Sequence, residues 1–332
     1  VLNQGLFGQG ERDVFEVSLP NGLSFKYILH PKNQTPIIIG PRHNYKIVHS
    51  TGDIVVTDDS GIQYTFTAYT FNGKYAPLTY LLTEIKDTRS NIISLSYVDA
   101  SYYSIPVVSE YYTIGYPLHN DFTKRNFNST TNKAPYLSKI ESNTEEIKFT
   151  LSSREDLSPG TTGRLVSIEI KNKLNNEIIY SYNFDYSYFM CATNAIGGNA
   201  LSSEDCKGAA GYASQNPEVT LRKRLKLLSL SKQNNNLQGE TYSFIYNEEQ
   251  PLPYKTSFAM DYWGFYNGAE NISSLTGYRH TLIPSIEGLG INQNALIIQG
   301  QELPAQTAVR NASRKYITAN MLKKITYPTG GS

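Results

Sequence analysis

The stretch DIVVTDDSGIQYTFTAY, residues 53–69, contains two runs in which apolar and polar side chains alternate, one on each side of DDSG. Alternation with a period of two is typical of β-strands that have one buried face. Asp, Ser and Gly between the runs favour a tight turn, so the stretch predicts a β-hairpin. An EF-hand calcium loop would need oxygen ligands at alternating positions over about twelve residues, and this pattern is absent. Asp58 and Asp59 are therefore interpreted as turn residues.

Similar units recur along the chain. Each begins with Leu-x-x-Ile or Leu-x-x-Leu, and in the complete units a polar turn and a second alternating run follow. They occupy residues 80–97, 136–151, 164–186 and 224–246, and a further unit opens at 321. The predicted strands lie near 54–58, 62–69, 80–86, 92–98, 164–171, 177–186, 224–231 and 241–247. The sequence therefore predicts an all-β fold of consecutive antiparallel hairpins in large twisted sheets, with long loop insertions and little helix.

Composition favours the same fold class. The 332 residues include 26 tyrosines and 13 phenylalanines, and aromatic residues suit half-buried pleated surfaces. The hairpins keep no fixed period, since insertions at 102–135 and 190–220 separate them. The chain is therefore interpreted as one continuous β-rich region, 1–332, with a possible soft break near 118–134. Both ends look cut, so we expect a piece of a longer protein, and a short helix is expected near 313–322.

Charge and hydropathy exclude several partners. The net charge is +1, which gives no basis for binding nucleic acid. No apolar run approaches the roughly 18 residues of a membrane-spanning helix, so no membrane insertion by this segment is expected. The one basic cluster, RKRLK at 222–226, is interpreted as the solvated edge of a strand rather than a phosphate-binding patch.

The sequence shows no motif for catalysis, metals or cofactors. The five histidines form no His-x-x-x-His or Glu-x-x-His pair, and Gly-x-Ser-x-Gly, a phosphate loop and a dinucleotide fingerprint before a helix are all missing. The neighbouring carboxylates Glu145/Glu146, Glu155/Asp156 and Glu248/Glu249 would point to opposite faces of a strand. We therefore predict no catalytic residue, no metal and no cofactor, and a protein that is not an enzyme.

Two cysteines, Cys191 and Cys206, lie within a Gly-, Asn- and Ser-rich stretch. A disulfide closing a loop of this length would stabilise the fold by about 3 kcal/mol in the chain-entropy description. Such a bond would imply an oxidising, extracytoplasmic setting. A pair of free thiols is the alternative.

The only tryptophan lies in DYWGFYNG, residues 261–268, and two interpretations of this stretch are open. As a structural corner, it would use Asn267-Gly268 as a turn pair and Asp261 as an acceptor of hydrogen bonds from the turn. Trp263 would be buried and share a face with Phe265, while Tyr262 and Tyr266 would occupy the other face. As a glycan platform, the same rings would be exposed to stack on sugars.

The order of several motifs resembles large secreted or cell-surface proteins of Bacteroidetes that carry RHS/YD repeats, in the segment that precedes the repeats. These motifs are GIQYTFTA at 61–68, RLKLLSLS at 224–231, YSFIYNEEQPLP at 242–253, DYWGFYNG at 261–268 and LKKITYPTGG at 322–331. The resemblance implies a scaffold that forms or adjoins a β-shell and is extracellular or surface-exposed. Its partner would be the remainder of its own polypeptide, namely the YD repeats and a possible C-terminal cargo domain.

Two functional hypotheses therefore stand. The first is a non-catalytic structural segment of an RHS/YD-repeat-like protein. The second is a carbohydrate-binding surface module that uses exposed aromatic residues, with glycans as partners.

Overall fold

A computed structural model describes residues 13–40, 44–50, 52–69, 79–103, 107–112, 123–128, 131–157, 162–191, 221–234, 237–255, 257–269, 272–273, 279–280, 282, 295–298, 301–304 and 308–331. The predicted all-β class is confirmed, with antiparallel hairpins as the building unit. A short α-helix, α3 (Arg314–Ile317), lies inside the range where a helix was expected, and residues 221–222 are also helical. No helix in the described part of the chain is both long enough and apolar enough to cross a membrane.

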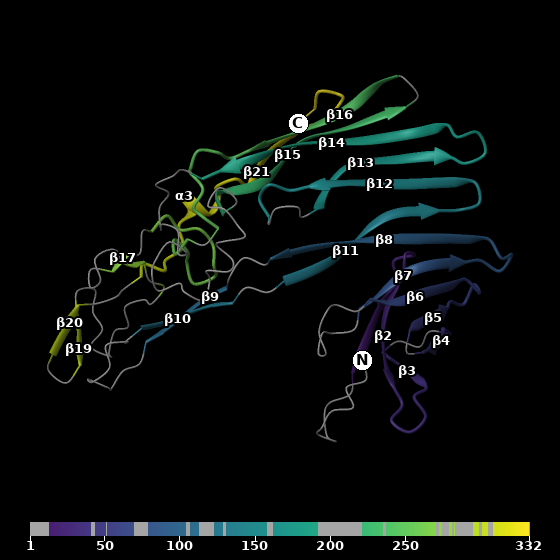
Figure 1. Cartoon of the computed structure of the whole chain (residues 1–332), viewed down its shortest axis with the longest axis horizontal. Helices are drawn as coiled ribbons and strands as arrows, with labels where there is room; N and C mark the ends of the chain where they lie inside the picture. The colour runs from purple at the N-terminus through teal and green to yellow at the C-terminus, as the bar shows by residue number, and fades with distance from the viewer. Residues whose placement is uncertain are drawn as a thin grey trace. The chain divides into compact units, whose positions relative to one another are not determined.

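The largest sheet has twelve strands in the order β21-β16-β15-β14-β13-β12-β11-β8-β7-β6-β5-β4 (Figure 1). Most strands lie beside their neighbours in sequence, as expected for consecutive hairpins. The strands are β4 (Lys46–His49), β5 (Asp53–Thr57), β6 (Gln63–Tyr69), β7 (Thr79–Lys86), β8 (Ile92–Tyr103), β11 (Thr131–Glu141), β12 (Glu145–Ser153), β13 (Thr162–Asn172), β14 (Ile178–Met190), β15 (Lys223–Asn234), β16 (Leu237–Tyr246) and β21 (Leu322–Thr326).

Smaller sheets complete the described structure. One has the order β1 (Val14–Ser18), β2 (Ser24–Leu29), β3 (Pro36–Ile39). The insertion at 102–135 contains the hairpin β9 (Val107–Tyr112) and β10 (Thr123–Asn128). Two further short pairs are β17 (Ile272–Ser273) with β18 (Arg279–His280), and β19 (Ala295–Ile298) with β20 (Gln301–Pro304). All eight predicted strands are present, whereas β1 to β4 were not predicted.

The chain divides into two compact units, each described here by itself. The first comprises Val1–Asp99, Pro135–Thr150 and Ile168–Ser181, and the second comprises Ala100–Ala134, Leu151–Ser167 and Tyr182–Ser332. The chain therefore passes between the units several times. The proposed soft break at 118–134 stays a prediction, and part of it lies outside the described residues.

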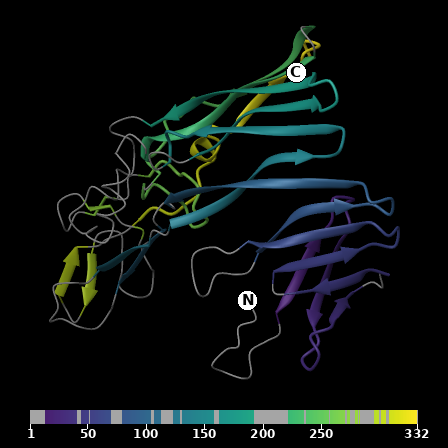
Figure 2. The ribbon, with the colours of Figure 1, turned by 45° about the vertical axis from the view of Figure 1, so that its right-hand side comes forward.

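The first unit is held by a core between two sheets. Side chains of β1 and β2 pack against those of β5 and β6, and in Figure 2 the purple strands lie against the violet-blue ones. Tyr27 and Val56 are fully buried at the centre of this core. In β2 and β5, buried residues alternate with exposed or half-buried ones, as expected for strands with one buried face.

Several hairpins share one turn of five residues. In it the first amide donates to the fifth carbonyl, the fourth amide donates to the first carbonyl, and the fourth residue has positive φ. This is the three-residue hairpin loop, a type I turn followed by a left-handed residue. It occurs at 19–23, 58–62 and 87–91, where Gly22, Gly61 and Ser90 take φ of +86°, +82° and +67°.

In the second unit, cross-strand aromatic and cationic pairs accompany the strands. The Arg164 guanidinium lies 5.7 Å from the centre of the Tyr186 ring, and the Lys226 amine lies 5.1 Å from that of Phe189. Along β15, residues 223–232 are all half-buried instead of alternating between buried and exposed. Long side chains that lie across neighbouring strands explain this even burial, because they cover backbone and ring surface on both faces.

Candidate functional site

Residues 261–265, DYWGF, form the same hairpin turn. The amide of Asp261 donates to the carbonyl of Phe265 (2.8 Å), and Gly264 takes φ of +87°, which glycine adopts at little cost. The Asp261 oxygen Oδ1 accepts hydrogen bonds from the amides of Trp263 (2.8 Å) and Phe265 (2.9 Å). The prediction that Asp261 accepts hydrogen bonds from this turn is confirmed.

Two hairpins of the large sheet have the same turn but carry polar residues at its tip. At 58–62 and 87–91 an aspartate in first position accepts bonds from the third and fifth amides, as Asp261 does. The two tip residues there are Asp-Ser and Thr-Arg. The backbone and the aspartate are thus sufficient for the turn, so Tyr262 and Trp263 at the tip of 261–265 are not needed to form it.

The aromatic residues of this turn face outward. Trp263 is 84% exposed, Tyr262 62% and Phe265 53%. The prediction that Trp263 is buried is wrong, and so is the arrangement of the rings on two faces of a strand. Both assumed an extended stretch, whereas the Asp261 carboxylate and Gly264 fold the chain back at this point. We call Tyr262, Trp263 and Phe265 the aromatic tip.

The base of the turn is fixed by residues from another segment. Arg310 donates from Nη2 to the carbonyl of Asp261 (2.6 Å), and its guanidinium lies 5.4 Å from the centre of the Tyr262 ring. Asn267, which is 6% exposed, donates from Nδ2 to the carbonyl of Val309 (2.8 Å). Asp261 itself is 1% exposed. The exposed tip is therefore carried on a buried, hydrogen-bonded base.

Tyr316 of α3 packs against the end of this segment. Its ring makes an edge-on contact with the ring of Tyr266, with centroids 5.2 Å apart. Burial, with a smaller contribution from Tyr316, raises the pKa of Tyr266 to about 12. Gly268 has φ of +72°, as expected for a turn glycine, and a Cβ atom at this position would lie 2.3 Å from the Tyr316 ring. Among the seven predicted corner residues, Asp261, Tyr266, Asn267 and Gly268 are thus structural.

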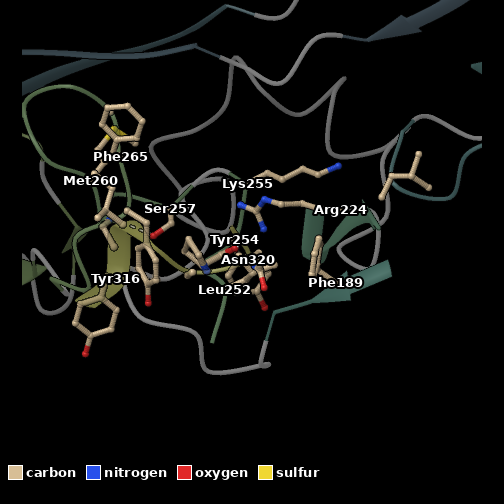
Figure 3. Close-up of a pocket in the computed structure, with 17 residues that line it drawn as sticks. Phe189, Arg224, Leu252, Tyr254, Lys255, Ser257, Met260, Phe265, Tyr316 and Asn320 are labelled. Atoms are coloured by element: carbon tan, nitrogen blue, oxygen red, sulfur yellow. Dashed lines mark hydrogen bonds between the residues drawn. The ribbon is translucent and has the colours of Figure 1, made fainter. Parts of the chain in front are cut away.

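A hollow of about 460 Å³ adjoins the corner. Figure 3 shows Phe265, Met260 and Tyr316 toward one side and Lys255, Arg224 and Phe189 toward the other. The hollow thus has the cations Lys255 and Arg224 on one side and the rings of Phe265 and Tyr316 on the other.

A buried carboxylate binds several cations next to this hollow. Asp156, whose side chain is 3% exposed, accepts two hydrogen bonds from Arg154, at 2.9 Å from Nε and 2.7 Å from Nη2. It also accepts the amide of Leu225 (3.2 Å), and the Lys255 amine lies 3.7 Å away. Burial alone would raise the pKa of Asp156, but the bonds and charges of Arg154 and Lys255 outweigh it and lower the pKa.

Lys255 is buried among these charges. Its side chain is 8% exposed, and its amine also donates to the carbonyl of Asp156. Burial lowers the pKa of Lys255 to about 8. The charge of Asp156 opposes this shift, and those of Arg224 and Arg154 add to it.

Residues 223–226 of the basic cluster lie on an inner strand, and Arg222 directly precedes it, so the prediction of a solvated strand edge is wrong. β15 is hydrogen-bonded between β14 and β16, and residues 222–226 are half-buried. Arg224 donates from Nη1 to the carbonyl of Pro253 (2.8 Å), and Arg222 donates to the carbonyl of Cys191 (2.7 Å from Nη2).

Cys191 has a free thiol and is 1% exposed, in a small core with Phe189, Leu221, Leu252 and Tyr254. Burial raises the pKa of this thiol, and Arg222 opposes the shift only partly. Its predicted disulfide partner, Cys206, lies outside the described residues. The thiol of Cys191 is unbonded in the structure, so the predicted disulfide is not formed there, and the alternative of a free thiol holds for Cys191.

Among the residues that the structure describes, no three His, Cys, Asp or Glu side chains are grouped to hold a metal ion. His49 lies in the core of the first unit, where its Nδ1 is 2.7 Å from the Tyr27 hydroxyl. Burial lowers the pKa of His49, which fits a core role.

Comparison with known proteins identifies no family for this chain. No family model matches the chain, and no curated protein matches it. The chain is similar to a solved structure of a porin-like protein from Bacteroides uniformis ATCC 8492, at 11% identity over 71% of this chain and 76% of that one, with a TM-score of 0.24. A likeness this distant carries no argument about function.

Sequence reasoning missed Asp156, Arg154, Lys255 and Arg310. Asp156 was considered only as a member of an adjacent carboxylate pair. The basic cluster at 222–226 was the signal that could have found them. Cations on an inner strand are partly buried, so they need hydrogen-bond acceptors or a carboxylate nearby.

Proposed function

We propose that this chain is a non-catalytic structural segment of a large secreted or surface protein of the RHS/YD-repeat type. The observation that carries the proposal is the twelve-stranded sheet, in which hairpins are added mostly in sequence order. An architecture of this kind extends by further hairpins without rearranging those already formed.

The segment after β21 supports the same proposal. The amide of Tyr327 donates to the carbonyl of Gly331 (2.8 Å), and Gly330 takes φ of +82°. This bond pattern matches the turns at 58–62 and 87–91, each of which leads into the next strand of this sheet. A strand that leaves the turn at 327–331 would accordingly pair with β21.

The proposal is tested by hydrogen exchange at β21. A protein that carries the residues encoded after Ser332 should protect the β21 amides that point away from β16 more strongly than the 332-residue chain does. The amides of β4 at the other end of the strand order serve as the control and should not change. A stop codon directly after Ser332, or unchanged exchange at β21, contradicts the proposal.

A second candidate, glycan binding, is favoured by the aromatic tip. Three rings are exposed on a turn that does not need them, on a base fixed by Asp261, Arg310 and Asn267. Aromatic rings present broad apolar faces, and Tyr and Trp add a polar group at the edge. Rings on a rigid base also lose little conformational freedom when a ligand binds.

For this candidate, Trp263→Ala is expected to change the free energy of unfolding by less than about 0.5 kcal/mol, because the ring is 84% exposed. Affinity for a glycan that the native protein binds should fall by about tenfold or more. Thermal unfolding and a glycan-binding screen measure the two effects.

Leu174→Ala is the matched control, since Leu174 is 78% exposed at another turn. It should leave both the stability and the binding unchanged. If the native protein binds no glycan in the screen, or if Trp263→Ala binds as tightly as the native protein, glycan binding is rejected. The structural proposal is unaffected by that outcome.

A further inference from the structure

The described residues that line a second hollow, of about 400 Å³, include more cations than anions. Its lining residues are Arg154, Asp156, Leu157, Arg224, Leu225 and Lys255. Three of them carry a positive charge, and one carries a negative charge. One carboxylate cannot neutralise three cations, so the described lining has an excess of positive charge at neutral pH.

The hydrogen bonds of Asp156 show that its carboxylate offsets only a small part of the positive charge in this hollow. Arg154 holds both of its oxygens in a two-pronged pair, and the amide of Leu225 takes up a further acceptor site. Lys255 is left at 3.7 Å from the carboxylate, beyond hydrogen-bonding distance, and meets the backbone carbonyl of Asp156 instead. Asp156 is thus primarily the partner of Arg154.

The neighbouring acids do not supply the missing charge. Glu155 is 63% exposed and pairs with Lys223 (2.5 Å), and Glu248 is 54% exposed and pairs with Lys226. Each of these carboxylates is therefore matched by a lysine of its own. Among the described carboxylates, Asp156 is the one whose charge acts on both Arg224 and Lys255.

The donors of Arg224 and Lys255 are only partly used. Arg224 donates from Nη1 to the carbonyl of Pro253, and its other N–H groups have no protein acceptor in the described part of the chain. The Lys255 amine has three N–H donors, and its described oxygen contacts are both with Asp156. Burying a cation whose donors are incompletely satisfied is costly unless an anion completes the site.

We propose that this hollow binds an oxyanion, held between Arg224 and Lys255. A carboxylate, sulfate or phosphate group has the charge and the acceptor oxygens that a guanidinium and an ammonium recognise. The inference is independent of the scaffold proposal. It rests on the charge excess, the hollow and the burial of Lys255.

The oxyanion can come from two sources, a free inorganic ion or an acidic sugar. Arg224 and Lys255 also line the larger hollow, which reaches Phe265 of the aromatic tip. An acidic sugar could therefore contact Arg224 and Lys255 through its carboxylate while its ring lies toward Phe265.

Isothermal titration of the whole chain with inorganic phosphate, sulfate and glucuronate tests the proposal and distinguishes the sources. Binding of phosphate or sulfate indicates that the free ion suffices, and binding of glucuronate alone indicates an acidic sugar. Arg224→Gln and Lys255→Gln should each weaken binding by about tenfold or more. Lys323→Gln, which removes a charge with a 61% exposed side chain outside the hollow, should change it by less than about twofold.

A second readout does not depend on whether the variants fold. Only the neutral amine reacts with an acylating reagent, and at pH 8 a large share of the Lys255 amine should be neutral because its pKa is about 8. A bound anion should raise that pKa and slow the reaction severalfold. Peptide mass spectrometry measures this on the native protein. The proposal is overturned if none of the three anions binds, if binding is equal in the native protein and in folded Arg224→Gln, or if no anion slows the labelling of Lys255.

Discussion

Asp156→Ala is expected to lower the free energy of unfolding by about 3–5 kcal/mol. The alanine removes the carboxylate that pairs with Arg154 and lies beside Lys255, and it also leaves the Leu225 amide without its acceptor. The charges that remain are buried and repel one another. Chemical denaturation of the native and variant proteins at neutral pH measures the difference.

Glu155→Ala is the control for this exchange. Glu155 precedes Asp156 and also pairs with a lysine, but its side chain is 63% exposed. An exposed ion pair contributes at most about 1 kcal/mol, so this variant should remain close to the native protein. Equal losses of unfolding free energy in the two variants would show that the contribution of Asp156 to stability does not depend on its burial.

Gly268→Ala is expected to destabilise the protein by about 2–5 kcal/mol. A Cβ atom at this position would lie 2.3 Å from Cε2 of Tyr316, so the ring or the turn must move. Displacement of packed atoms costs about 1–3 kcal/mol. The φ of +72° adds about 1–2 kcal/mol for a residue with a Cβ.

Gly264→Ala separates these two contributions. Gly264 has φ of +87°, but no atom lies within 4 Å of the position that a Cβ would take. This variant should therefore show only the backbone cost, about 1–2 kcal/mol. Thermal unfolding of both variants gives the comparison, and similar losses at the two glycines would contradict the predicted clash with Tyr316.

The hairpins could be predicted because their determinants are local. Alternation of apolar and polar residues sets the strand period, and Asp at the first turn position with Gly or Ser at the fourth sets the turn. The stretch 53–69 contains both signals and forms β5 and β6 with the turn at 58–62. The sheet β1 to β3 was not predicted, although its strands show a similar alternation of more and less buried residues.

The corner at 261–268 shows which features of the structure the local sequence does not determine. The sequence indicated correctly that Asp261 accepts bonds from the turn and that Gly268 takes a turn conformation. It did not indicate which rings are exposed, because five positions of DYWGF fit a strand as well as they fit a turn. Arg310, which lies against Tyr262 and Asp261, comes from a distant segment with no pattern that links it to the corner.

By itself, then, the sequence determined the all-β class and most hairpins of the large sheet, since strand period and turn chemistry depend on neighbouring residues. Only the tertiary structure decided that Trp263 is exposed and that a buried carboxylate lies among three cations. Asp156 and Lys255 are 99 residues apart in sequence, and Arg224 reaches them from an inner strand. The electrostatic energy of these charges depends on the distances between them and on their burial. Both are fixed only when the sheet has formed.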